Sequence, residues 1–220
     1  MKSMKTQNNI PLADSFIFDM DGTLWDALDT YVTSWNNGFI KENIDRVITS
    51  TDLAPMIGWE KCRSLEHLLP DHDLESQEKV FNTIREIQTK LLSEVGGVLY
   101  EGVKEGLAQL SKKYKLFIVS NCAENGIKQF MEWAGISEYI TDEMAHGVNG
   151  MPKHHNIKTL IEKYYLQTPV YVGNTETDSI ESRKAGIPFV FMEGGFGDKE
   201  DYGLKFDDFK RFAEYFMVLK

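Results

Sequence analysis

The sequence predicts a two-domain α/β protein built on a Rossmann-like, mostly parallel sheet. Short apolar runs alternate with helical patterns over most of the chain, whereas one long interval looks helical and holds no run of strand type. Alternating strands and helices favour parallel strands joined by right-handed crossovers. We therefore expect a core formed by residues 1–26 and 97–220, with a helical cap formed by residues 27–96.

Four apolar runs show no polar alternation, so each is expected to be a strand that is buried on both faces. They are residues 16–18, 116–119, 170–172 and 188–192. Helices are expected in the core at 103–114, 123–133, 156–165 and 179–185, and in the cap at 28–42, around 52–69 and at 76–94. Gly186 suits the left-handed position that ends a helix. The hinges between core and cap are expected at residues 25–28 and 95–102.

Composition excludes several classes of protein. The formal net charge is −10 and we find no basic stripe, so a nucleic-acid partner is not expected. No apolar run approaches the ~18 residues of a membrane span, so no membrane partner is expected either. Residues 1–15 lack the apolar core of a secretory signal, and Cys62 and Cys122 form no disulfide or zinc pattern. These observations favour a reduced, cytoplasmic protein; they do not predict its oligomeric state.

Polar residues follow three of the expected strands. They are Asp19 and Asp21 after the first, Ser120 and Asn121 after the second, and Asn174 with Asp178 after the third. In an open parallel sheet, ligands bind beyond the carboxyl ends of the strands. We therefore expect these residues to meet at one site, although they are far apart in the sequence.

Asp19 and Asp21 lie two positions apart, which in a strand puts both carboxylates on one face. Two such carboxylates repel each other unless a cation or a shared proton offsets the charge. A hard divalent cation such as Mg²⁺ would do so. One carboxylate can then attack an electrophile while the other moves protons. Gly22 allows the sharp turn and the close approach of a ligand.

Four motifs in this chain resemble those of the haloacid dehalogenase superfamily, whose members are mostly magnesium-dependent phosphatases. The motifs are "DMDGT", "LFIVSN", "GMPK" and "YVGNTETDSIESRKAGIP". Their order and spacing match over nearly the whole chain. The helical interval resembles the C1 cap of the phosphoglycolate phosphatase-like members. The resemblance implies a phosphatase that acts through an aspartyl phosphate.

The resemblance also implies a role for each matching residue. Asp19 would be the nucleophile, and Asp21 would protonate the leaving oxygen and later activate water. Ser120 would bind a phosphoryl oxygen, and Lys153 would neutralise charge. Backbone N–H groups near Met20 and Asn121 would help to bind the substrate. The implied Mg²⁺ ligands are the Asp19 carboxylate, the Asp21 carbonyl oxygen and the side chains of Asn174 and Asp178.

The fourth motif departs from the family pattern because Asn174 stands where an aspartate is usual. An amide oxygen can bind magnesium but brings no negative charge. Three outcomes stay open: Asn174 binds the metal, Glu176 substitutes for it, or metal affinity is weakened. A catalytically impaired phospholigand-binding or regulatory protein is therefore an alternative function. A sugar phosphomutase is less favoured, because Tyr31 stands where such mutases carry a cap histidine.

The segment "APMIGWEKCRS" is the candidate substrate-facing loop of the cap. Gly58 would form its turn, and Lys61 or Arg63 would bind a second anionic end of the substrate. Equally, the cations could face solvent while Met56 and Trp59 pack between cap helices. The expected substrate is a small phosphorylated metabolite, which the sequence does not name.

Overall fold

The computed structural model describes residues 12–197 and 203–219, so residues 1–11, 198–202 and 220 of the expected core lie outside it. Its main sheet has six parallel strands in the order β5-β4-β1-β6-β7-β8. Their bounds are β1 Ser15–Phe18, β4 Lys115–Ser120, β5 Asp142–Ala145, β6 Pro169–Gly173, β7 Phe189–Met192 and β8 Lys205–Phe206. The expected α/β class with a parallel sheet is confirmed.

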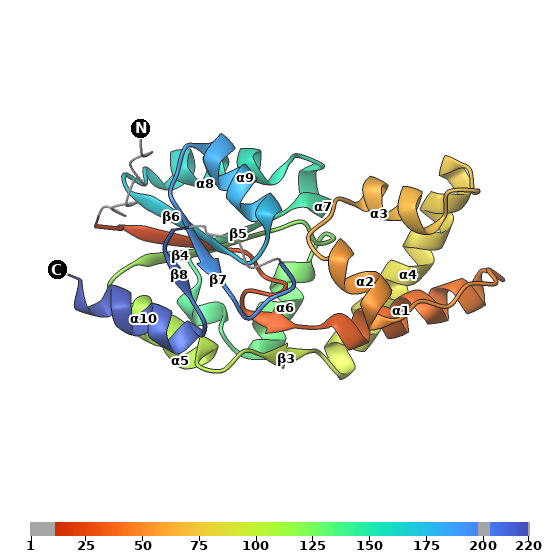
Figure 1. Ribbon diagram of the computed structural model, residues 1–220, viewed down its shortest axis with the longest axis horizontal. Coiled ribbons are helices and arrows are strands. Elements are labelled where there is room, and N and C mark those ends of the chain that lie inside the picture. The colour runs from red at the N-terminus through yellow and green to blue at the C-terminus, as the bar shows by residue number, and fades with distance from the viewer. Residues whose placement is uncertain (1–11, 198–202, 220) are drawn as a thin grey trace, which may run out of the picture.

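Both faces of the sheet are covered by helices (Figure 1). Phe16 and Phe18 point into one apolar cluster, which includes the phenylalanines of α10 (Phe209–Val218), while Ile17 points into the other. Side chains of successive strand residues face opposite sides, and burial on both sides explains the continuous apolar runs. The remaining core helices are α5 Val103–Leu110, α6 Gly126–Ala134, α7 His146–Asn149, α8 Lys153–Tyr164 and α9 Glu176–Ala185. Gly186 ends α9 with φ +84°, as expected.

Two edge strands, β5 and β8, were not expected from the sequence. Strand β5 reads Asp-Glu-Met-Ala and is only partly buried, so it lacks the apolar run that identifies the central strands. Strand β8 has two residues, and pairing with β7 alone defines it. Edge strands contact fewer core residues, and their sequences are correspondingly less apolar.

Four helices and a 3₁₀ turn follow β1 and lie to one side of the sheet (Figure 1). They are α1 Leu28–Lys41, α2 Ser50–Leu53, η1 Ala54–Met56, α3 Lys61–Leu68 and α4 Leu74–Glu94. The short strands β2 (Trp25–Asp26) and β3 (Val98–Leu99) pair antiparallel where the chain leaves and re-enters the core. The two connections therefore lie side by side. The boundaries between core and cap at residues 26/27 and 96/97 stay a prediction.

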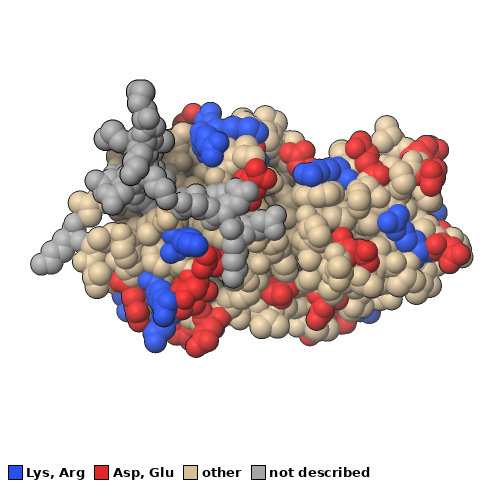
Figure 2. Space-filling view, in the orientation of Figure 1, with Lys and Arg blue, Asp and Glu red and all other residues tan. Residues whose placement is uncertain are grey.

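The helices of the described ranges include none that is both long and apolar enough to span a membrane. On the face shown in Figure 2, acidic and basic side chains are intermixed.

Candidate active site

The carboxyl ends of β1, β4 and β6 bring the expected polar residues together. These three strands are neighbours in the sheet. Asp19 follows β1, Ser120 ends β4 and Asn174 follows β6, and all three are buried. The Asp19 backbone N–H donates to the Val172 carbonyl at 2.8 Å, which keeps Asp19 in register with β6. The site is therefore built from rigid strand ends.

Lys153 joins two buried carboxylates. It is the first residue of α8, and its Nζ donates to Asp19 Oδ1 at 2.8 Å and to Asp178 Oδ1 at 2.6 Å. Burial raises the pKa of Asp19 to about 7, although the Lys153 charge opposes that shift. Burial alone would lower the pKa of Lys153, but Asp178 and Asp19 raise it well above its usual value. Lys153 therefore stays a cation beside the expected nucleophile.

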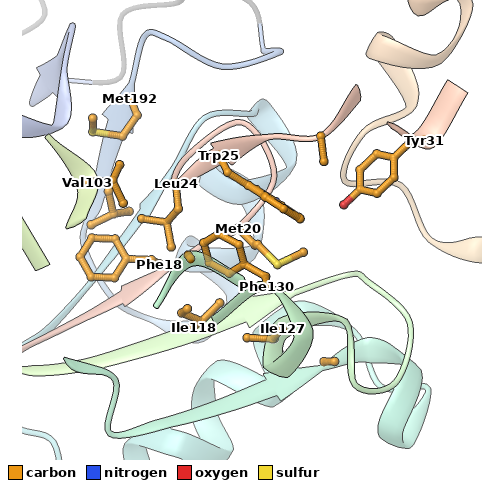
Figure 3. Packing of buried hydrophobic residues seen from close by; sticks show 14 of the residues in the cluster. Phe18, Met20, Leu24, Trp25, Tyr31, Val103, Ile118, Ile127, Phe130 and Met192 are labelled. Atoms are coloured by element: carbon orange, nitrogen blue, oxygen red, sulfur yellow. The ribbon is translucent and has the colours of Figure 1, made fainter. Parts of the chain in front are cut away.

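Asp21 is held by two donors, neither of which the sequence motifs indicated. Trp25 Nε1 and Tyr31 Oη both donate to Asp21 Oδ1, at 2.9 and 2.7 Å. Tyr31 comes from the cap helix α1, and Figure 3 shows its hydroxyl end turned toward the core residues. Both bonds leave Oδ2 as the oxygen that can carry a proton. Burial raises the pKa of Asp21 to about 6, against these two hydrogen bonds, which lower it.

Asn174 packs tightly against the turn that follows β1. Gly22 has φ +83°, and a Cβ there would lie 2.2 Å from a terminal atom of the Asn174 amide, so both the turn and the contact require glycine. In the amide orientation that satisfies its neighbours, Nδ2 donates to the Asp21 carbonyl oxygen and to Thr23 Oγ1, each at 3.0 Å. Oδ1 then accepts from the Phe196 N–H at 2.9 Å.

This amide orientation bears directly on cation binding. The Asp19 carboxylate, the Asp21 carbonyl and the Asn174 amide supply oxygen atoms, the ligand type that Mg²⁺ takes. With its oxygen turned toward the Asp21 carbonyl, Asn174 would point its NH₂ at the Phe196 N–H, so two donors would meet. An aspartate would supply an oxygen on both sides. The donor set therefore fits Mg²⁺ in kind, but Asn174 must lose a hydrogen bond to contribute.

No group of three His, Cys, Asp or Glu side chains in residues 12–197 and 203–219 is arranged to hold a metal. The Asn174 amide and the Asp21 backbone carbonyl are outside that set of side chains, although an oxygen of either kind can bind Mg²⁺. Glu176 is exposed on the first turn of α9, whereas Asn174 is fully buried beside Asp21. Of these two candidate ligands, Asn174 is therefore the one that lies at the site.

Asp178 organises the loop between β6 and α9. Its Oδ2 accepts from the backbone N–H groups of Asn174 (3.1 Å) and Thr175 (3.0 Å) and from the Thr175 hydroxyl (2.7 Å). The Thr175 hydroxyl in turn accepts from the Asp178 N–H, which completes a capping box at the start of α9. Protein donors thus occupy both Asp178 oxygens, and its expected role as a metal ligand stays a prediction.

The candidate cap loop contacts the core through Asn121, whose Nδ2 donates to the Gly58 carbonyl at 2.8 Å. Met20 is buried beneath the site, beside Trp25 and Phe130 (Figure 3). Lys61 borders the same pocket as Asp19 and Ser120, but its Nζ contacts both Glu78 oxygens, at 2.8 and 3.1 Å. Substrate binding by these residues stays a prediction.

Arg63 lies apart from the pocket over Asp19. Its guanidinium stacks 3.6 Å from the ring centroid of Trp59. It borders a neighbouring hollow that also includes Lys153, Thr177 and Glu181. Its expected contact with a second anionic end of the substrate likewise stays a prediction.

A family model described as haloacid dehalogenase-like hydrolase matches residues 16–192. The phosphoglycolate phosphatase of Synechococcus elongatus is 25% identical over 205 residues, covering 84% of this chain and 86% of that protein. The phosphoglycolate phosphatase of Rhodobacter capsulatus is 22% identical over 209 residues, covering 90% and 94%. A crystal structure from Clostridium acetobutylicum, described as a predicted phosphatase, is 19% identical with a TM-score of 0.81, covering 95% of this chain and 100% of that one. At this identity the structural likeness shows the fold alone.

Proposed function

The chain belongs to the haloacid dehalogenase-like hydrolase family, and on that premise we propose that it hydrolyses a small phosphate monoester through a phosphorylated Asp19. It is a phosphatase similar to phosphoglycolate phosphatases. The observation that carries the mechanism is the buried cluster of Asp19, Lys153 and Asp21, with Asp21 fixed by its own donors.

In the first step an Asp19 carboxylate oxygen attacks phosphorus, and the bond between phosphorus and the alcohol oxygen breaks. Asp21 Oδ2 gives its proton to that leaving oxygen. In the second step Asp21 takes a proton from water, which attacks the phosphorus of the aspartyl phosphate. Inorganic phosphate leaves and Asp19 is restored. Each step moves one phosphoryl group and one proton, as general acid and base catalysis requires.

The other site residues stabilise the charge of the transferred group. Lys153 neutralises the nucleophile and the phosphoryl oxygens, and Ser120 donates its hydroxyl to one of them. The backbone N–H groups of Met20 and Asn121 complete the set. Phosphoryl transfer depends mainly on such positioning and charge stabilisation.

Mg²⁺ is the cation that we propose for this site. The Asp19 carboxylate and the Asp21 carbonyl would hold it, with Asn174 and Asp178 as the further candidate ligands. When bound, it would offset negative charge on the phosphoryl oxygens. We also keep a cytoplasmic location and a small phosphorylated metabolite as predictions.

One observation favours the alternative of a phospholigand-binding protein without turnover. The Asn174 amide satisfies the Asp21 carbonyl by itself, so the site has less need of a cation than one with an aspartate. Wild-type binding of phosphate monoesters without hydrolysis at saturating Mg²⁺ would support this alternative.

The decisive experiment measures phosphate release from a panel of small monoesters, with and without Mg²⁺. We expect Mg²⁺-dependent turnover by the wild type and a loss of at least about a thousandfold in Asp19→Asn, because the nucleophile is gone. Asp45→Asn, a change of the same kind on the exposed cap surface, serves as the control. Undiminished turnover by Asp19→Asn would refute the aspartyl-phosphate route.

A further inference from the structure

The pocket above Asp19 and Ser120 extends into the cap and has a volume of about 140 Å³. We call it the cap pocket. The core contributes Asp19, Asp21 and Ser120 at one end, so a bound phosphate ester would direct its alcohol toward the cap. Asn121, Cys122 and Ala123 of the core also line it, and the rest of the lining comes from α1, α2, η1, α3 and α4 and from the loop after η1.

The cap side of this pocket is mainly apolar and aromatic. Its lining includes Tyr31, Trp35, Met56, Ile57, Phe81 and Ile84. Most of these side chains are buried, and they are part of or packed against the main apolar cluster. Burying hydrocarbon against such a surface is favourable, whereas burying an unpaired carboxylate there is costly.

The cations near the pocket are already engaged or exposed. The Lys61 ammonium is paired with Glu78 and lies 5.4 Å from the ring centroid of Phe81. The Arg63 guanidinium stacks on Trp59, and Arg63 itself does not line the cap pocket. Arg85 borders the pocket but is exposed to solvent, where a contact between charges contributes little. A carboxylate on the leaving group would therefore gain little here.

The pocket also has the size of a small ring. An apolar cavity of about 150 Å³ holds a benzene molecule in another protein. A second hollow of about 250 Å³ lies beside the cap pocket and shares Tyr31, Arg85 and Gln88 with it.

Resting on the proposed phosphatase function, we propose that the substrate is a phosphate monoester of an uncharged alcohol with a ring-sized apolar group. The ring would occupy the cap pocket between the aromatic side chains of α1 and α4. This class differs from phosphoglycolate, whose leaving group carries a carboxylate. In this proposal Lys61 and Arg63 support the cap and do not bind the leaving group.

The test compares benzyl phosphate, ethyl phosphate and 2-phosphoglycolate as substrates of the wild type, since all three release a primary alcohol. We expect kcat/KM for benzyl phosphate to exceed that for ethyl phosphate by about 10- to 100-fold, from burial of the ring. Phosphoglycolate should be no better than ethyl phosphate. A kcat/KM for phosphoglycolate equal to or above that for benzyl phosphate would overturn the proposal and leave the phosphatase function intact.

A second measurement is independent of turnover. Binding of benzylphosphonate, methylphosphonate and phosphonoacetate, which are not hydrolysed, can be followed by tryptophan fluorescence because Trp35 and Trp59 border the pocket. Tightest binding of benzylphosphonate supports the substrate class even if no ester is hydrolysed, in which case the phosphatase proposal alone fails. Tighter binding of phosphonoacetate, or no difference among the three, overturns the substrate class.

Variants on α4 locate the ring. Phe81→Ala should lower the ratio of benzyl to ethyl phosphate kcat/KM by about tenfold, because one wall of the pocket is lost. Leu74→Ala, an exposed apolar residue on the same helix, should leave that ratio unchanged. The proposal is wrong if the wild type hydrolyses phosphoglycolate best and Arg85→Ala selectively abolishes that hydrolysis. Arg85 would then bind the carboxylate of the leaving group.

Discussion

The core end of the site contains buried charged groups, whereas the cap pocket is lined mainly by uncharged side chains. At the core end, buried charges are brought close together and each is matched: Lys153 contacts two carboxylates, and Asp21 is held by two donors. In the cap pocket the lining is mainly apolar, and the Lys61 ammonium is paired with Glu78 on α4. In the function that we propose, the core carries out the reaction and the cap selects the shape and polarity of the leaving alcohol.

The largest expected effect comes from removing the central cation of the core. Lys153→Met leaves the Asp19 and Asp178 carboxylates buried without the cation that they share. We expect the free energy of unfolding to fall by about 3–5 kcal/mol, as for other broken buried ion pairs, together with loss of activity. Urea denaturation measures the change.

Lys163→Met is the matched control, because it removes a lysine of the same helix that forms an exposed ion pair with Asp142. It should have little effect on stability. Equal free energies of unfolding for Lys153→Met and Lys163→Met would show that the buried ion pairs of Lys153 stabilise the core no more than an exposed pair does.

Asn174→Asp sharpens the comparison by adding a charge at the core end. The new carboxylate can accept from the Phe196 N–H and still present an oxygen beside the Asp21 carbonyl. We expect Mg²⁺ affinity, measured by calorimetry, to rise by about 10- to 100-fold.

Asn37→Asp adds the same charge on the exposed surface of α1 and should not change that affinity. An unchanged affinity in Asn174→Asp would mean that the Asn174 amide orientation does not limit cation binding.

Tyr31→Phe tests the connection between cap and core. It removes one of the two donors to Asp21 Oδ1 but keeps the ring, so Trp25 alone orients the carboxylate. We expect kcat to fall by about tenfold with little change in KM, because the lost bond positions the proton donor without binding the alcohol.

Tyr114→Phe is the matched control, since it removes a buried hydroxyl that donates to the Phe216 carbonyl away from the site. It should leave kcat unchanged. If Tyr31→Phe instead raised KM alone, the Tyr31 hydroxyl would bind the substrate and would not position Asp21.

Asn121→Ala should have the smallest effect. It removes the bond between the end of β4 and the Gly58 carbonyl of the cap loop. We expect an increase in KM of about two- to fivefold for ring-bearing esters, because one neutral hydrogen bond holds the loop over the pocket. A loss of kcat larger than that of Tyr31→Phe would show that Asn121 acts on the phosphoryl group directly.

The sequence alone predicted the central strands and the polar residues at their carboxyl ends. Phe16–Phe18 followed by Asp19 and Asp21 is a local pattern: a doubly buried strand must be continuously apolar, and its end must carry the polar groups that bind ligand. The edge strand β5 lacks that burial, and its sequence accordingly did not reveal it.

Only the tertiary structure decided which partner each of these groups has. The bonds donated by Tyr31 to Asp21, by Lys61 to Glu78 and by Phe196 to Asn174 join segments that the folded chain brings together. The sequence left Lys61 as either a substrate contact or a surface cation; in the folded chain Glu78 of α4 lies beside it and pairs with it. The charge and hydrogen bonds available to a ligand depend on such long-range pairs, which no local pattern encodes.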